Sequence, residues 1–196
     1  MQEEDAKTEK RKLVTKIVAE SFFVLIFASV LSSIGGIGIE AVQRKIIFFL
    51  PLLIVIPALN DMIGDFGTIV ASNFTTLLYL GKIHAKNWWR EAEIKRLLIR
   101  ITLTSLLTAV YLGGLAYALA MLRGFRFDPL LFFKVLLTTM TITVTLVLAV
   151  CIISIIGGFY VHKHNHDPDN YLIPLATGVA DLLSMVVLAL MVTWLF

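Results

Sequence analysis

Three aspartates, Asp61, Asp65 and Asp181, stand inside long apolar stretches of the sequence. A charged side chain near the centre of a bilayer costs at least about 2.5–3.5 kcal/mol, so such acids are paired, hydrated or bound to a cation. Every Lys and Arg falls in a polar break or at the end of an apolar segment, which leaves the acids without a basic counter-charge at their depth. The missing positive charge is most simply a transported cation or a proton.

The residue types around the acids indicate which cation they suit. Carboxylate, amide and backbone oxygens are hard ligands, which favour Mg²⁺ or Ca²⁺ over metals that prefer thiolate. Asp61 and Asp65 are four residues apart, so a continuous helix places both on one face, where they repel unless a cation lies between them. The predicted supporting residues near the ion are Asn60, Gly64, Thr68 and Thr177. The alternative is that the acids only fix helix packing, being protonated or hydrogen-bonded to Asn60, Thr68 and Thr177.

A second group of possible ligands is the polar stretch that contains His162, His164 and His166, followed by Asp167 and Asp169. Histidines and acids together offer enough ligands for a transition metal, but spacing by two in a loop fits no specific zinc pattern. We interpret the stretch as a solvated loop, and a weak cytoplasmic metal site is the alternative.

The elements that position these residues are membrane helices. Of 196 residues, 58% are hydrophobic and 16% charged, and the mean hydropathy is +0.87, which excludes a soluble globular protein. Apolar segments at residues 13–39, 46–80, 93–122, 129–161 and 171–196 predict an all-α polytopic membrane protein with about five transmembrane helices. The second segment is too long for one straight span and contains Pro57, Gly64 and Gly67. We expect this helix to be bent or broken near its middle.

The basic residues divide unequally between the two ends of the predicted bundle. Five lie on one side, at Arg44, Lys45, Arg123, Arg126 and Lys134. Twelve lie on the side of the N-terminus, at Lys7, Lys10, Arg11, Lys12, Lys16, Lys82, Lys86, Arg90, Lys95, Arg96, Arg100 and Lys163. The excess predicts a cytoplasmic N-terminus. We therefore expect a short polar cytoplasmic segment at 1–12 and a transmembrane domain at 13–196, multi-pass in the cell membrane. The isoelectric point is near 9.0, but in a membrane protein the basic residues are judged by the side of the bilayer that they occupy, and no nucleic-acid partner is expected.

Two stretches interrupt the apolar pattern with small, polar and acidic residues: PALNDMIGDFGTIVASNFTT at 57–76 and DPDNYLIPLATGVADLL at 167–183. They resemble the two signature regions of the membrane domain of MgtE-type magnesium transporters, and the closer likeness is to their eukaryotic solute-carrier relatives. The resemblance implies a divalent-cation pathway along a two-fold axis between the second and fifth helices of two subunits, with Asp181 as the main carboxylate. The family's Gly-Asn-x-Gly turn corresponds to residues 64–67, where Asp65 replaces the asparagine and adds a negative charge.

The sequence also differs from the family pattern in two ways. MgtE proteins carry cytoplasmic regulatory domains ahead of the membrane domain, whereas about a dozen polar residues stand at that place in this sequence, so we expect a form without them. The eukaryotic relatives carry two copies of the membrane domain, and this sequence contains one. We expect a single-repeat form that acts as a homodimer, because two chains give six acids around a symmetry axis.

The sequence therefore predicts a transporter or channel for a divalent cation in the lipid bilayer. Mg²⁺ is the favoured ion, although Mn²⁺, Co²⁺ and Ca²⁺ use overlapping ligands. The alternative is a Na⁺- or H⁺-coupled divalent cation carrier or exporter, in which one aspartate binds Na⁺ or titrates. An enzyme is not expected, because nothing in the membrane segments supplies a nucleophile, an oxyanion site or a metal-histidine cluster.

Overall fold

The computed structural model describes residues 2–83, 88–164 and 166–196, and every regular element in these ranges is a helix. The elements are α1 (Gln2–Glu40), α2 (Gln43–Phe48), α3 (Leu50–Tyr79), the 3-10 turn η1 (Trp88–Arg90), α4 (Ala92–Leu122), α5 (Pro129–Lys163) and α6 (Pro168–Leu195). Five helices are long and apolar enough to cross a membrane, namely α1 from Lys7 onward and the whole of α3, α4, α5 and α6. The predicted all-helical fold with five spans is confirmed.

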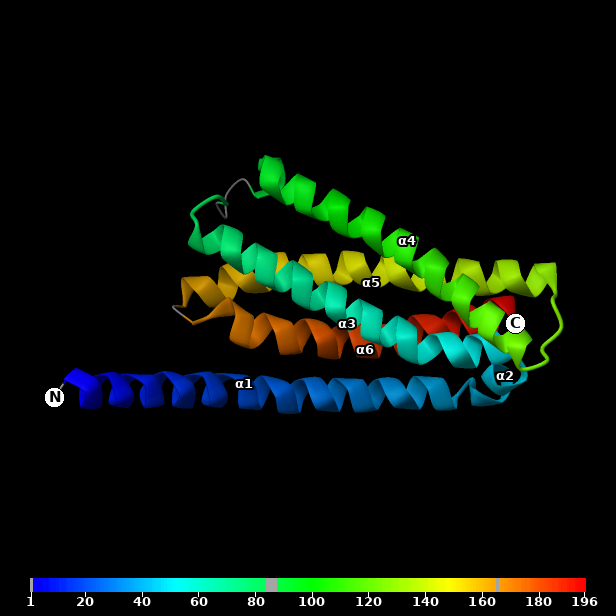
Figure 1. Cartoon of the computed structure of the whole chain (residues 1–196), viewed down its shortest axis with the longest axis horizontal. Coiled ribbons are helices and arrows are strands. Elements are labelled where there is room, and N and C mark those ends of the chain that lie inside the picture. Colours follow the sequence, from blue (N-terminus) through cyan, green and yellow to red (C-terminus); the bar gives the residue numbers. More distant parts are fainter. Residues whose placement is uncertain (1, 84–87, 165) are drawn as a thin grey trace.

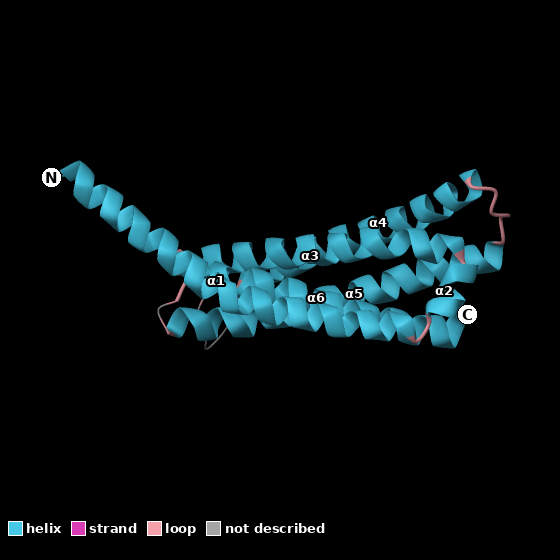
Figure 2. Ribbon diagram, turned by 90° about the horizontal axis from the view of Figure 1, so that it is seen from below, coloured by secondary structure: helices cyan, strands magenta, loops and turns pink. Residues whose placement is uncertain are grey.

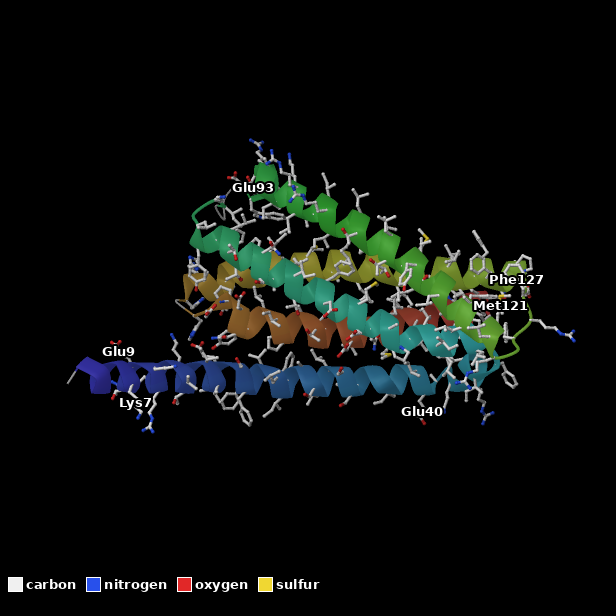
Figure 3. All side chains as sticks on the ribbon, viewed as in Figure 1. Lys7, Glu9, Glu40, Glu93, Met121 and Phe127 are labelled. Atoms are coloured by element: carbon white, nitrogen blue, oxygen red, sulfur yellow. The ribbon has the colours of Figure 1, made fainter. Side chains whose placement is uncertain are left out.

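The long helices run up and down, so their connections gather at two ends (Figure 1). The N-terminus lies at one end with the α3–α4 and α5–α6 connections, and the C-terminus lies at the other with α2 and the α4–α5 connection. In Figure 3 Glu93 marks the first end, and Glu40 and Phe127 mark the second. The termini are thus on opposite sides, as an odd number of spans requires. Of the basic residues used for the predicted orientation, Lys86 lies outside the described residues.

The first helix is longer than its apolar part. No Gly or Pro occurs before Gly35, so nothing in the sequence interrupts the helix between the polar residues and the membrane segment. The predicted boundary at residue 13 is accordingly not a break in the backbone, and α1 is continuous over its 39 residues. Its N-terminal part projects away from the other helices (Figure 2).

The second predicted segment is interrupted, but upstream of the expected position. The backbone leaves the helix at Phe49 (φ −112°, ψ 82°), just before Pro51, and this separates α2 from α3. From there α3 continues as one α-helix through Pro57, Gly64 and Gly67, so a break or unwinding near its middle is not what the structure shows, and a bend there stays a prediction. The physical reason is that Pro57 removes only one backbone donor, while α3 is packed along its length by α4, α5 and α6.

Local sequence fixes where α5 and α6 begin. Each starts with an aspartate followed by a proline, at Asp128 and Asp167. The Asp128 carboxylate accepts a hydrogen bond from the backbone N–H of Leu130 at 2.9 Å, and the Asp167 carboxylate accepts one from that of Asp169 at 3.2 Å. Proline in the first turn costs no helical hydrogen bond, because that N–H has no partner in a helix.

The helix α6 lies between α1 on one side and α3 and α5 on the other (Figure 1). The core is formed by α3, α4, α5 and α6, and its largest fully buried side chains include Leu52, Ile63, Phe74, Tyr117, Ile142, Leu146 and Leu172. By contrast, α1 packs mainly along α6 and leaves large apolar side chains such as Phe23 and Ile37 exposed. Asp181 therefore lies on the helix that joins α1 to the rest of the bundle.

Candidate functional site

A groove between α3 and α6 brings together the acids that the sequence singles out. It has a volume of about 390 Å³ and is lined by Pro57, Asn60, Asp61, Gly64, Asp65, Thr68, Thr177 and Asp181. All of the site residues predicted within the membrane line it, and Pro57 is the one addition. Residues more than 100 positions apart in the chain thus meet on one surface.

The groove lies near the middle of the membrane-spanning helices. Asp65 is at the centre of the 30-residue α3, and Asp181 is at the centre of the 28-residue α6. These two helices run in opposite directions and pack against each other (Figure 1), so their centres lie at similar depth. With a rise of about 1.5 Å per residue, each centre is roughly 20 Å from either end of its helix.

Asp61 and Asp65 are exposed and one turn apart on an uninterrupted helix, so they share a face. Within the described part of the chain, neither carboxylate has a hydrogen bond, and no ion pair joins either of them, or Asp181, to a basic residue. The predicted lack of a counter-charge is thus seen in the structure. Two like charges at this spacing repel, which favours a bound cation between them.

Asp181 differs from the other two acids because it has a partner. It is half-buried, and its Oδ2 accepts a hydrogen bond from the Ser32 hydroxyl of α1. Ser32 is not among the site residues predicted from the sequence, which indicated only a packing role for the small residues of this helix. The available signal was the small residues Ala28, Ser32 and Gly35 on one face of α1, which indicates a close helix contact but not which helix supplies it.

A second serine that the sequence analysis missed links the two sides of the groove. The Ser184 hydroxyl lies 2.6 Å from Asn60 Oδ1 on α3 and 2.8 Å from the backbone oxygen of Asp181 on its own helix. Ser184 is only 2% exposed. It therefore fixes α6 against α3 directly behind the acid-lined surface.

The hydroxyl groups in the groove bond to their own helices. Thr68 donates to the backbone oxygen of Gly64 at 3.2 Å, and Thr177 donates to that of Ile173 at 2.9 Å. Such bonds are usual for Thr in membrane helices. The alternative in which Asn60, Thr68 and Thr177 hydrogen-bond to the acids is therefore not what the structure shows.

The arrangement suits a cation that keeps part of its water. Among residues 2–83, 88–164 and 166–196 there is no group of three or more His, Cys, Asp or Glu side chains close enough to hold a metal ion directly. The acids are instead spread along the groove, and at about 30 Å³ for each water molecule its 390 Å³ has room for a hydrated ion. Its polar side chains offer oxygen ligands, as hard divalent cations prefer.

The three histidines proposed as a weak metal site face different partners. The His162 ring packs edge-on against a tyrosine ring of α3 with centroids 5.3 Å apart. His164 Nδ1 lies 2.8 Å from the backbone oxygen of Tyr160, and His166 Nδ1 lies 3.0 Å from Glu20 Oε1. The structure does not bring these rings to one point.

Comparison with known families adds the decisive observation. The divalent cation transporter family MgtE matches residues 56–191, more than half of the chain. The chain belongs to the MgtE family of divalent cation transporters. The match includes every residue that lines the groove and leaves α1 outside. MgtE is a family of transporters rather than enzymes, which agrees with the expectation that the chain is not an enzyme. No curated protein and no solved structure shows significant similarity to the chain.

Proposed function

We propose that this MgtE-family chain moves Mg²⁺ across the cell membrane as a homodimer, with the groove between α3 and α6 as part of the ion pathway. The observation that carries the proposal is the set of three carboxylates, Asp61, Asp65 and Asp181, which line one groove without a described basic partner. A divalent cation would supply the positive charge that balances these carboxylates.

The exposure of the acids supports a second copy of the chain. Asp61 and Asp65 lie on the outer side of one chain near the middle of the span, where contact with lipid costs about 2.5–3.5 kcal/mol for each charge. A second copy on the same face covers the groove, and two-fold symmetry then places six acids around one axis. The pathway runs between α3 and α6 of both subunits, which are the second and fifth membrane helices.

The proposed ion is Mg²⁺, and the acid-lined groove with room for a hydrated ion supports this choice. Mg²⁺ gives up its water reluctantly and commonly binds through one or two carboxylates while keeping several waters. In the proposed pathway Asp181 is the main ligand, and Asp65 and Asp61 attract and hold the partly hydrated ion. A membrane potential that is negative inside favours inward flow of the cation by about 2.3 kcal/mol per charge per 100 mV.

A second candidate is a carrier that couples the divalent ion to Na⁺ or H⁺. It is favoured by the presence of two kinds of carboxylate, since Asp181 is held by Ser32 while Asp61 and Asp65 have no described partner. One kind then binds the divalent ion and the other binds Na⁺ or a proton. The likeness to the eukaryotic solute-carrier relatives stays a prediction from the two motifs.

The test is Mg²⁺ flux into proteoliposomes under an imposed membrane potential, comparing wild type with Asp181→Asn. A matched control is Asp167→Asn, which removes one charge from the start of the same helix and keeps a good N-cap. We expect flux in the wild type and in Asp167→Asn and none in Asp181→Asn. Equal flux in wild type and Asp181→Asn contradicts the proposed pathway.

Two further measurements separate the finer alternatives. A steep dependence of flux on an opposing Na⁺ or pH gradient supports the coupled carrier, and flux set by the potential alone supports the channel or uncoupled transporter. Native mass spectrometry of the active protein in detergent is expected to give twice the 21.9 kDa chain mass. A fully active monomer contradicts the homodimer.

A further inference from the structure

A helix outside the matched family stretch contacts the groove's central acid. The family match begins at residue 56, after α1 has ended, yet the Ser32 hydroxyl of α1 donates a hydrogen bond to Asp181 Oδ2. Ser32 is not among the residues that line the groove, so it reaches the carboxylate from the α1 side. It acts on the ion only through Asp181.

We propose that Ser32 is a positioning residue that holds one oxygen of Asp181 and leaves the other for the cation, and that this favours Mg²⁺ over Ca²⁺. The inference rests on the proposed function, because it takes Asp181 as the main ligand of the transported ion. It makes α1 a functional part of the transporter rather than only a membrane anchor.

Close packing of the two backbones brings the short serine and aspartate side chains within reach of each other. A Cβ added at Gly178 of α6 would lie 2.6 Å from both Cα and Cβ of Ala28 on α1. Ser32 and Asp181 follow these two residues by about one turn on helices that run in the same direction (Figure 1). The Ala28–Gly178 contact thus sets the spacing that the Ser32–Asp181 hydrogen bond requires.

Ser32 behaves differently from the neighbouring serines of α1. Ser29 and Ser33 are exposed and donate to the backbone oxygens of Leu25 and Ser29, at 2.9 Å and 2.8 Å. This is the usual bond of a serine in a membrane helix. Ser32 instead donates to a carboxylate of another helix. Ser33 therefore provides a matched control, since it differs from Ser32 by one position and lacks the contact with Asp181.

A donor to a metal-binding carboxylate tunes binding without touching the ion. Outer partners of this kind fix the orientation of the ligand, and their loss typically costs 10–100-fold in affinity. With one oxygen of Asp181 held by Ser32, the carboxylate binds most readily through the other oxygen alone. Mg²⁺ accepts this geometry, whereas Ca²⁺ tolerates flexible coordination and often takes both oxygens of a carboxylate. Removing the hydroxyl should therefore harm Mg²⁺ more than Ca²⁺.

The experiment measures Mg²⁺ flux of the full chain in proteoliposomes, with and without competing Ca²⁺, for wild type, Ser32→Ala, Ser32→Thr and Ser33→Ala. We expect Ser32→Ala to raise the half-saturating Mg²⁺ concentration about tenfold and to lower several-fold the ratio of half-inhibitory Ca²⁺ to half-saturating Mg²⁺. Ser32→Thr keeps the hydroxyl and should stay within about threefold of wild type, and Ser33→Ala should match wild type. If Ser32→Ala is not recovered folded, Ser32→Cys, which keeps the volume and donates only weakly, should shift both values in the same direction.

The outcomes separate this inference from the proposed function. Unchanged half-saturation and an unchanged ion ratio in Ser32→Ala overturn the role of Ser32, and so does an equal shift in Ser33→Ala, which indicates a general effect on α1. Asp181→Asn is assayed in parallel. A wild type without flux, or an Asp181→Asn variant that transports normally, overturns the proposed pathway and this inference with it.

Discussion

Two hollows of similar size differ in whether their acids have partners. One is the groove between α3 and α6, and the other is a pocket at the N-terminal end of the bundle. The end pocket has a volume of about 350 Å³ and is lined by Lys16, Ile17, Glu20, Tyr79, His162, His166, Asp167 and Asn170. One of its two acids, Glu20, lies 3.8 Å from Lys16 Nζ, 3.0 Å from His166 Nδ1 and 3.1 Å from Asn170 Nδ2. In the groove, the described contacts of the three carboxylates reduce to one serine hydroxyl.

The difference supports the proposal that Glu20 maintains the fold while Asp61, Asp65 and Asp181 bind an ion. Glu20 uses its charge to join α1 to the start of α6, where its partners satisfy both carboxylate oxygens. The groove lies at mid-span, where an unpaired carboxylate is far more costly, and yet no basic side chain among the described residues pairs with its acids. In the proposed function, a bound divalent ion offsets this unfavourable concentration of negative charge.

The strongest contrast is expected from neutralising the two exposed acids of the groove. In Asp61→Asn/Asp65→Asn two charges near the ion are lost, each worth about 2 kcal/mol against a divalent ion at about 4 Å in a water-like medium. The half-saturating Mg²⁺ concentration in proteoliposome flux should rise roughly 700-fold. Glu20→Gln serves as the control at the other polar pocket and should stay within about twofold of wild type. Equal effects of the two changes would remove the distinction between the regions.

The next effect concerns the packing of α1 against α6, the two helices that meet both at the end pocket and at Asp181. Gly178→Ala places a methyl group 2.6 Å from the Ala28 backbone, so α1 must shift, at a cost of about 1.5 kcal/mol. Gly36→Ala on α1 meets no atom within 4 Å and should be neutral or slightly stabilising. Thermal unfolding of the purified variants in one detergent checks the prediction. Identical melting temperatures for the two variants would show that this contact is not tight.

A smaller loss of stability is expected when the end pocket alone is altered. Glu20→Gln removes the charge that Lys16 and His166 contact, and partly exposed pairs of this kind contribute up to about 1 kcal/mol. The melting temperature should fall by a few degrees while the flux is preserved, and the fall should shrink at high salt because exposed charges are screened. A flux defect larger than the change in stability would assign Glu20 to the ion pathway instead.

The smallest effect is expected from the histidine stretch. His162 and His164 contact different neighbours, so the double substitution His162→Ala/His164→Ala should leave Mg²⁺ flux unchanged. Calorimetric titration with Zn²⁺ should give no stoichiometric binding in either protein. Stoichiometric binding in wild type that is lost in the variant would establish the metal site that the alternating histidines suggest.

Much of the fold and of the groove could be predicted from the sequence because these features depend on local patterns. Apolar length determines a spanning helix, and the positions of Lys and Arg determine that Asp61, Asp65 and Asp181 have no partner of opposite charge at their depth. The depth of an acid follows from counting residues along a helix of fixed rise. The lining of the groove accordingly contains all the predicted membrane residues.

The prediction of a broken second helix failed because it used only local breakers. Pro57, Gly64 and Gly67 weaken a helix in isolation, but the cost of each is small beside the packing of α3 against three neighbouring helices. The break occurs instead at Phe49, two residues before Pro51, where the chain turns from α2 into α3.

What the sequence alone determined is the number of spans, the family likeness and the oxygen ligands at mid-membrane, because hydropathy, motif and charge are properties of the chain itself. Only the tertiary structure decided that Ser32 holds Asp181 and that Ser184 joins Asn60 to α6. These contacts depend on which helix is adjacent and how it is rotated about its axis. The local sequence around Ser32 and around Asp181, about 150 positions apart, does not predict this contact, because it forms only when the helices pack.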